Sequence, residues 1–136
     1  MKVYIYQLDA MTNMQVGNGE VNFGVVDNLI QRDAATDFPV VNASGIKGAF
    51  REYLSGKCYI TELFGSNPND AKNHESGKLR FFDASLIAMP VRCSNVPYLM
   101  GTCPMLINDY MSKCKVLGNS IDCRGMEKLL ESIDKP

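Results

Sequence analysis

A long segment without a regular hydrophobic period, residues 11–42, most constrains how this chain can fold. The segment is rich in glycine and asparagine. Loops of this length are uncommon inside compact domains, where they are usually functional or disordered. Two patterned pieces, Val25-Val26 and Pro39-Val40-Val41, favour an ordered segment. We therefore expect a long functional loop with regular elements on either side of it.

The two elements that flank this loop have different periods. Residues 2–10 alternate, with Val3 and Ile5 on one side and apolar side chains also on the other, which predicts a central strand. Residues 44–56 instead repeat apolar side chains at helical spacing; Ser44 suits the N-cap and Gly56 the end of such a helix. The expected apolar face of the helix comprises Ile46, Ala49, Phe50, Tyr53 and Leu54.

The rest of the chain predicts a polar surface loop followed by strands and helices. The loop covers residues 65–77, and strand-like runs follow at residues 78–89 and 96–102. A helix is expected from Pro104 to Lys115, because proline suits a first turn, and an amphipathic piece runs from Gly125 to Ile133. The expected apolar side of the first of these helices comprises Met105, Leu106, Tyr110 and Met111.

This order of elements predicts an α+β fold in a single domain, residues 1–136, with helices on one face of an antiparallel sheet. A ferredoxin-like β-α-β-β-α-β domain needs one more strand than the chain offers. We therefore expect an incomplete version of such a domain.

The charge balance is nearly even, with 14 Lys and Arg against 15 Asp and Glu. Proteins that hold nucleic acid alone are usually basic, so an RNA partner would need local basic groups or neighbouring subunits. No apolar run reaches the ~18 residues of a membrane span. The N-terminal segment is too short and polar for a signal peptide, so we expect no membrane partner and a cytoplasmic location.

The cysteines and the histidine give little support to a metal site. The 5 cysteines are odd in number and lack a Cys-x-x-Cys pair, so reduced structural thiols are expected. His74 is the only histidine in the sequence, and its place in the polar loop predicts a solvated side chain. Any nucleophile–histidine pair would depend on that residue.

Three groups of segments follow one another along the sequence and carry a resemblance to a known family. The first is Val16-Gly17-Asn18-Gly19 with Gly24-Val25-Val26-Asp27-Asn28-Leu29-Ile30-Gln31-Arg32-Asp33. The second runs from Phe38 to Glu52 and contains Ser44-Gly45-Ile46-Lys47-Gly48. Together these resemble the RAMP-superfamily backbone subunits of type III CRISPR effector complexes. The third group is most similar to the III-B (Cmr) branch and comprises residues 64–66, 77–86, 90–92 and 102–104.

The chain departs from the family pattern at several positions. Gln15 stands where the family usually has histidine, so a role that needs an imidazole is lost there. Leu29 replaces a common proline, and Asn42-Ala43 replaces a common Pro-Gly. Family members are also longer, and their remaining part carries the rest of the RNA-binding fold and a thumb-like hairpin.

The resemblance implies a modified RNA-recognition fold that binds RNA without reading its sequence. Copies would self-associate in a helical filament along the guide (CRISPR) RNA, together with other effector subunits, and would cut paired target RNA. A helix start with glycines suits phosphate binding. From periodicity alone, Lys47 and Arg51 would instead lie on a solvated face. The RNA-binding residues that the resemblance implies are Ser44, Gly45, Lys47, Gly48, Arg51 and Arg32.

Asp27 is the residue that the resemblance implies to be catalytic and metal-binding. One carboxylate can hold a divalent cation, here expected to be Mg²⁺, through water and RNA phosphates, and the cation can stabilise the scissile phosphate while the 2′-hydroxyl attacks. Without the resemblance, Asp27 is a turn residue beside Asn28. Weaker candidates are Asp9, Asp33 and Asp37, whereas Asp83 is expected to anchor a strand end through a hydrogen bond.

Two functions follow for the chain. One is an endoribonuclease subunit, active only in the assembled complex, which the retained Asp27 favours. The other is a non-catalytic or truncated RNA-binding and scaffold module, which Gln15 and the short length favour. A small-molecule enzyme on an unrelated α+β fold would need paired catalytic groups, and the sequence offers none.

Overall fold

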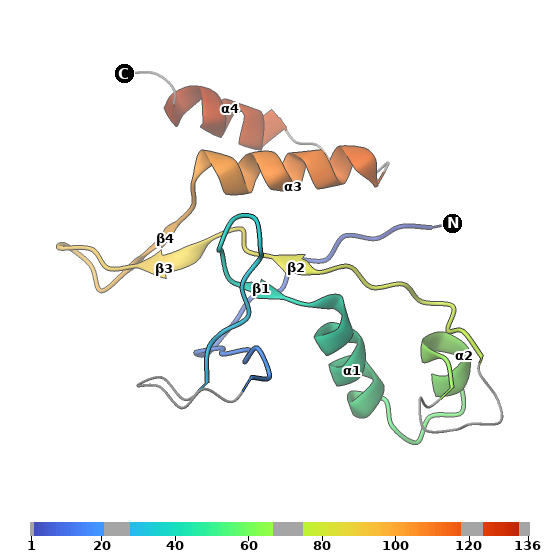
Figure 1. Cartoon of the computed structure of the whole chain (residues 1–136). Coiled ribbons are helices and arrows are strands. Elements are labelled where there is room, and N and C mark those ends of the chain that lie inside the picture. The colour runs from blue at the N-terminus through green and yellow to red at the C-terminus, as the bar shows by residue number, and fades with distance from the viewer. Residues whose placement is uncertain (1, 21–27, 67–74, 118–123, 134–136) are drawn as a thin grey trace. The chain divides into compact units, whose positions relative to one another are not determined.

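The computed structural model describes residues 2–20, 28–66, 75–117 and 124–133 (Figure 1). Its contacts group into two units, one formed by residues 15–85 and the other by residues 1–14 with 86–136. Short antiparallel strand pairs and helices occur in the described part, so the predicted α+β class is confirmed. The elements in chain order are β1 Val40–Val41, α1 Ala43–Tyr53, α2 Ile60–Phe64, β2 Ala84–Ser85, β3 Met89–Val91, β4 Leu99–Gly101, α3 Pro104–Val116 and α4 Arg124–Ile133.

In the unit of residues 15–85, β1 pairs with β2 and α1 follows β1 directly. The antiparallel register places Val40 opposite Ser85 and Val41 opposite Ala84. Helix α1 confirms the helix predicted at residues 44–56, but it begins one residue before Ser44 and ends at Tyr53. The N-cap position is therefore Asn42, and the expected capping by Ser44 is wrong.

The predicted apolar face of α1 is only partly packed. None of the residues of α1 is buried, and Tyr53 is 86% exposed. One contact of the helix is made by Phe50, which is 45% exposed and whose ring stacks on Phe81 with centroids 5.8 Å apart. Phe81 also stacks on Phe64, again at 5.8 Å, and Phe64 is only 2% exposed. These three rings, the aromatic stack, join α1, α2 and the chain before β2.

Helix α2 was not predicted from the sequence. It spans five residues, too few to show a helical period, and it ends where Gly65 adopts a positive φ of 88°. A glycine reaches this left-handed conformation at no steric cost, so it suits the end of a helix.

In the other unit, β3 and β4 form an antiparallel pair that leads into α3. Met89 lies opposite Gly101, and the Thr102 hydroxyl donates a hydrogen bond to the Ile87 carbonyl at 2.7 Å. Pro104 occupies the first turn of α3, as predicted, and α4 packs against α3 (Figure 1). The buried side chains of α3 are Leu106, Ile107, Met111 and Cys114. The expected burial of Met105 is wrong, because that side chain is 56% exposed.

The strand predicted at residues 2–10 is wrong. The segment contains no strand, and Tyr4 and Tyr6 are 67% and 80% exposed. The alternation of side chains along the sequence indicates that a strand would have two different faces, but a strand also needs a neighbouring strand to which it can hydrogen-bond. For the same reason the strand expected at residues 78–89 shrinks to β2 and the first residue of β3, whereas β4 lies inside the strand expected at residues 96–102.

Two further features concern the described residues alone. None of the helices seen there is long and apolar enough to cross a membrane. The thiols of Cys58, Cys93, Cys103 and Cys114 are free. Cys123, His74 and most of the polar loop lie outside the described residues.

Removing the central ring of the aromatic stack is expected to destabilise the fold. Phe81→Ala removes two ring contacts and part of the apolar packing under α1, which costs about 2–3 kcal/mol of unfolding free energy. The matched control is Phe82→Ala, because Phe82 is 61% exposed and should cost less than about 0.5 kcal/mol. Urea denaturation of both variants measures the difference, and equal midpoints would contradict the role of the stack.

Candidate functional site

Helix α1 presents a polar stripe of Ser44, Lys47, Gly48 and Arg51, at positions i, i+3, i+4 and i+7. Residues at this spacing lie on one helix face. Lys47 and Arg51 are partly buried, which differs from the fully solvated face that periodicity alone suggests. A Cβ added to Gly48 would meet no other atom within 4 Å, and the same is true at Gly45. Packing among the described residues therefore does not require either glycine.

Asp83 lies against the first turn of α1. Its Oδ1 accepts a hydrogen bond from the Ala43 amide at 2.6 Å, and the Gln31 side chain accepts one from the Asn42 amide at 3.1 Å. The expectation that Asp83 anchors a strand end through a hydrogen bond is confirmed, since the residue precedes β2. The carboxylate also places negative charge at the positive end of the helix dipole.

The two ends of the polar loop are clamped together by backbone contacts. Gly65 and Ser76 form an isolated β-bridge, and the Ser66 amide donates to the Glu75 carbonyl at 3.0 Å. A Cβ on Gly65 would lie 2.7 Å from the Glu75 carbonyl oxygen, and one on Gly77 would collide with backbone of the Phe64–Gly65 region. We call this closure, formed by residues 65–66 and 75–77, the loop neck.

Arg51 and an ion pair strengthen the loop neck from outside. The Arg51 guanidinium donates to the Ser66 carbonyl at 3.3 Å. The Lys78 ammonium donates to the Glu62 carboxylate at 2.5 Å, and this hydrogen bond and the lysine charge lower the pKa of Glu62. The contribution of the pair to stability is present at neutral pH and is lost as the pH falls through that lowered pKa. Both side chains are exposed, so the contribution is small.

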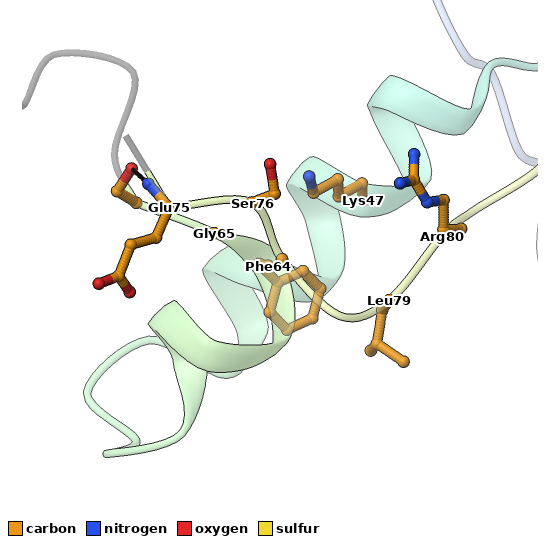
Figure 2. A pocket seen from close by; sticks show the side chains of 9 residues that line it. Lys47, Phe64, Gly65, Glu75, Ser76, Leu79 and Arg80 are labelled. Carbon is orange, nitrogen blue, oxygen red and sulfur yellow. Dashed lines mark hydrogen bonds between the residues drawn. The ribbon is translucent and has the colours of Figure 1, made fainter. Parts of the chain in front are cut away.

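A cavity of about 370 Å³ opens between α1 and the loop neck. Lys47 and Arg80 extend their charged ends toward the same side of it, where the Ser76 hydroxyl also lies (Figure 2). The Glu75 carboxylate points away from both cations (Figure 2). The lining residues are Lys47, Phe64, Gly65, Ser66, Glu75, Ser76, Gly77, Leu79 and Arg80. We call this cavity the basic pocket.

The segments on either side of Asp27 are paired, although Asp27 itself lies outside the described residues. Gly17 and Ile30 form an antiparallel bridge, the Asn18 amide donates to the Leu29 carbonyl at 2.8 Å, and the Gln31 amide donates to the Val16 carbonyl at 2.9 Å. The Gln15 amide donates to the Asn28 carbonyl at 3.1 Å. The chain is thus anchored at Asn28, one residue after Asp27.

The other candidates have structural partners. Arg32 donates to the Asp37 carbonyl at 2.6 Å and lies 3.8 Å from the Asp37 carboxylate. The Asp33 carboxylate accepts hydrogen bonds from the amides of Ala35 and Thr36 and so closes a turn. Among the described residues, no group of three or more His, Cys, Asp or Glu side chains could hold a metal ion.

The structure brings Lys47 to the basic pocket and places Arg51 on the loop neck, whereas Arg32 lies in a separate turn. Sequence reasoning did not single out Arg80 or Ser76. The available signal was the pair of glycines, Gly65 and Gly77, that bound the polar loop. Such glycines indicate a close approach of two backbones, which draws the residues beside them together.

Comparison with known proteins gives a consistent picture. The RAMP superfamily matches residues 7–132. The CRISPR system Cmr endoribonuclease Cmr4 of Pyrococcus furiosus is 31% identical over 123 residues, which are 87% of this chain and 41% of that protein. The chain therefore spans about two fifths of the length of that relative. The resemblance to the III-B (Cmr) branch is confirmed.

Solved structures with the same fold include Cmr proteins. A crystal structure of oligomeric Cmr4 from Pyrococcus furiosus matches 67% of this chain and 36% of its own, with a TM-score of 0.58 and 27% identity. A type III-B Cmr-beta structure in the apo state matches 91% of this chain and 47% of its own, with a TM-score of 0.68. At 22% identity, the second match bears on the fold alone.

Asp83 provides a test of how α1 is anchored. Asp83→Ala removes the acceptor for the Ala43 amide and should lower the unfolding free energy by about 1 kcal/mol, as the loss of a helix cap does. Asp83→Asn keeps an oxygen acceptor and loses only the charge at the helix end, so it should cost about 0.3–1 kcal/mol. Denaturation of both variants measures this order, and an Asn variant less stable than the Ala variant would contradict it.

Proposed function

Because the chain belongs to the RAMP superfamily, we propose that it forms part of a backbone subunit in an RNA-guided, RNA-targeting complex of the type III-B CRISPR kind. The observation that carries this proposal is the similarity to the Cmr4 endoribonuclease over most of the chain. The subunit binds guide RNA without reading its sequence, contacts target RNA, and associates with further copies and with other effector subunits.

The structural likenesses support this proposal at two levels. The oligomeric Cmr4 crystal structure supports self-association of copies. We propose that these copies form a filament along the guide RNA. The antiparallel pairs β1–β2 and β3–β4 form two separate sheets in the described residues, and with the helices they give an α+β arrangement. We propose that these elements belong to a modified RNA-recognition fold of ferredoxin-like topology. A protein can contact the backbone and the 2′-hydroxyl groups of RNA without reading the bases.

The polar stripe of α1 is the surface that we propose for the RNA backbone. Glycine inside a helix costs about 0.5–1 kcal/mol relative to alanine. Gly45 and Gly48 carry that cost although nothing in the described chain occupies the space beside them. Close approach of a partner would explain why these two positions are glycine, because an RNA backbone phosphate can approach a glycine more closely than any other residue. Ser44, Lys47 and Arg51 lie around the same positions.

Asp27 is the proposed catalytic residue. Its carboxylate would hold a divalent metal ion, probed first with Mg²⁺, together with water and phosphate oxygens of the RNA, which are the ligands that this ion prefers. When bound, the ion supplies charge neutralisation at the scissile phosphate. The paired segments 16–18 and 29–31, with Gln15 on the Asn28 carbonyl, support this role because they anchor the chain beside Asp27.

A non-catalytic RNA-binding or scaffold role is the second candidate. Its support is Gln15, which stands at the usual histidine position of the family and already uses its amide in a hydrogen bond to Asn28. An amide cannot exchange a proton near neutral pH as an imidazole can. This role predicts the same RNA binding without cleavage.

Cleavage by the reconstituted complex separates the two roles. Asp27→Asn should lower the rate of target-RNA cleavage by about a hundredfold or more, as removal of a single charge-stabilising group does. Binding of the guide RNA should not change. Asp109→Asn is the control, because Asp109 is an aspartate of α3 that pairs with Lys113 and is not a candidate for catalysis. Equal cleavage by the Asp27 variant and the parent would exclude the catalytic role.

Substitution of Gly48 separates stability from binding. Gly48→Ala should raise the unfolding free energy by about 0.5–1 kcal/mol, because the new methyl group meets no other atom. The same variant should bind guide RNA more weakly. Gly125→Ala in α4 is the matched control, since a Cβ there is equally unhindered. Thermal denaturation and RNA affinity measure both effects; an unchanged affinity for Gly48→Ala would contradict the proposed surface.

A further inference from the structure

We propose that Lys47, Arg80 and Ser76 bind one internal phosphate of the RNA backbone in the basic pocket, beside α1 and away from its N-terminus. This inference rests on the proposed function, since it takes RNA to be the partner. It adds Arg80 and Ser76 to the binding residues and gives Arg51 a different role from that of Lys47.

The side chains of the pocket that are free to bind a ligand are positively charged hydrogen-bond donors. Within the described part of the chain, neither the Lys47 nor the Arg80 side chain forms an ion pair or a hydrogen bond. Figure 2 shows the charged ends of both side chains on the side of the pocket where the Ser76 hydroxyl lies, with Lys47 between Ser76 and Arg80 in this view. The one carboxylate of the lining, on Glu75, points away. Two cations and a hydroxyl donor match a phosphate, which accepts several hydrogen bonds and carries negative charge.

The size of the pocket suits a phosphate that keeps part of its hydration. A volume of about 370 Å³ corresponds to about a dozen water molecules at about 30 Å³ each. That space admits a phosphate group and some water.

The N-terminus of α1 is less suited to the same phosphate. The Asp83 carboxylate already accepts the Ala43 amide there at 2.6 Å. A phosphate at that end would lie close to a fixed negative charge, and like charges at short range repel. Lys47, one turn further along the helix, lines the pocket.

The wall of the pocket is preorganised. The backbones at Gly65 and Gly77 approach each other so closely that neither position has room for a side chain. The Arg51 guanidinium donates a hydrogen bond to the Ser66 carbonyl at 3.3 Å. Arg51 is therefore a positioning residue of the loop neck, while Lys47 and Arg80 remain available for the ligand. A rigid wall reduces the entropy lost when a ligand binds.

Salt dependence of RNA binding tests the site. The probe is a fluorescent single-stranded oligoribonucleotide without a terminal phosphate, titrated with the full chain at several salt concentrations. Each phosphate contact to single-stranded nucleic acid contributes a slope of about 0.7 in log affinity against log salt concentration. Arg80→Gln should lower the slope by about 0.7, and Lys47→Gln should have a similar effect. Arg80→Lys, which keeps the charge, should restore most of the slope.

The control is Arg92→Gln, which changes the net charge by the same amount at an exposed residue outside the pocket. Its slope should equal that of the parent, and denaturation midpoints should show that all variants fold. A parent-like slope for Arg80→Gln would overturn the pocket site while leaving the proposed function intact. An effect of Arg80→Gln seen only with a 5′-phosphorylated oligonucleotide would overturn an internal phosphate as the ligand. A parent chain whose RNA binding does not depend on salt would overturn this site, whereas the proposed function is tested separately by target-RNA cleavage in the reconstituted complex.

Discussion

The stacking of Phe50, Phe81 and Phe64 is the interaction on which the candidate site depends. These rings come from α1, from the chain before β2 and from α2, so they bring three separate parts of the sequence together. Lys47 and Arg51 extend from the helix that carries Phe50, and Arg80 directly precedes Phe81. The charged residues of the pocket are therefore placed by an apolar contact next to them. Ring packing sets the positions of Lys47, Arg51 and Arg80 relative to one another, because none of the ion pairs in the described residues joins them.

Sequence reasoning predicted most of the helices and few of the strands, for a physical reason. A helix satisfies its hydrogen bonds within one segment, so the periods at residues 44–56 and 104–115 were sufficient for α1 and α3. A strand satisfies them with another segment, and the alternation at residues 2–10 carried no information about a partner. Helix α2 was too short to display a period.

Long-range contacts explain the remaining differences at the site. Ser44 is a good N-cap by local rules, yet the helix begins at Ala43, where Asp83 accepts the first amide from forty residues away in sequence. The structural role of Asp83 was predicted, but its partner was not. Arg51 was expected to contact phosphate, and its contact with Ser66 depends on the loop neck, which local patterns do not reveal. Asp27 remains a prediction from family resemblance.

The loop neck has a consequence for how the chain can vary. Backbone contacts join Gly65 and Ser66 to Glu75 and Ser76 and so close the loop at its base. Lengthening a closed loop is inexpensive in entropy, about 0.6 kcal/mol for each doubling of its length. The intervening segment can therefore be exchanged or extended, for example to carry a fluorescent label or an affinity tag, while the residues on either side keep their geometry. A protein engineer could use this position as an insertion point.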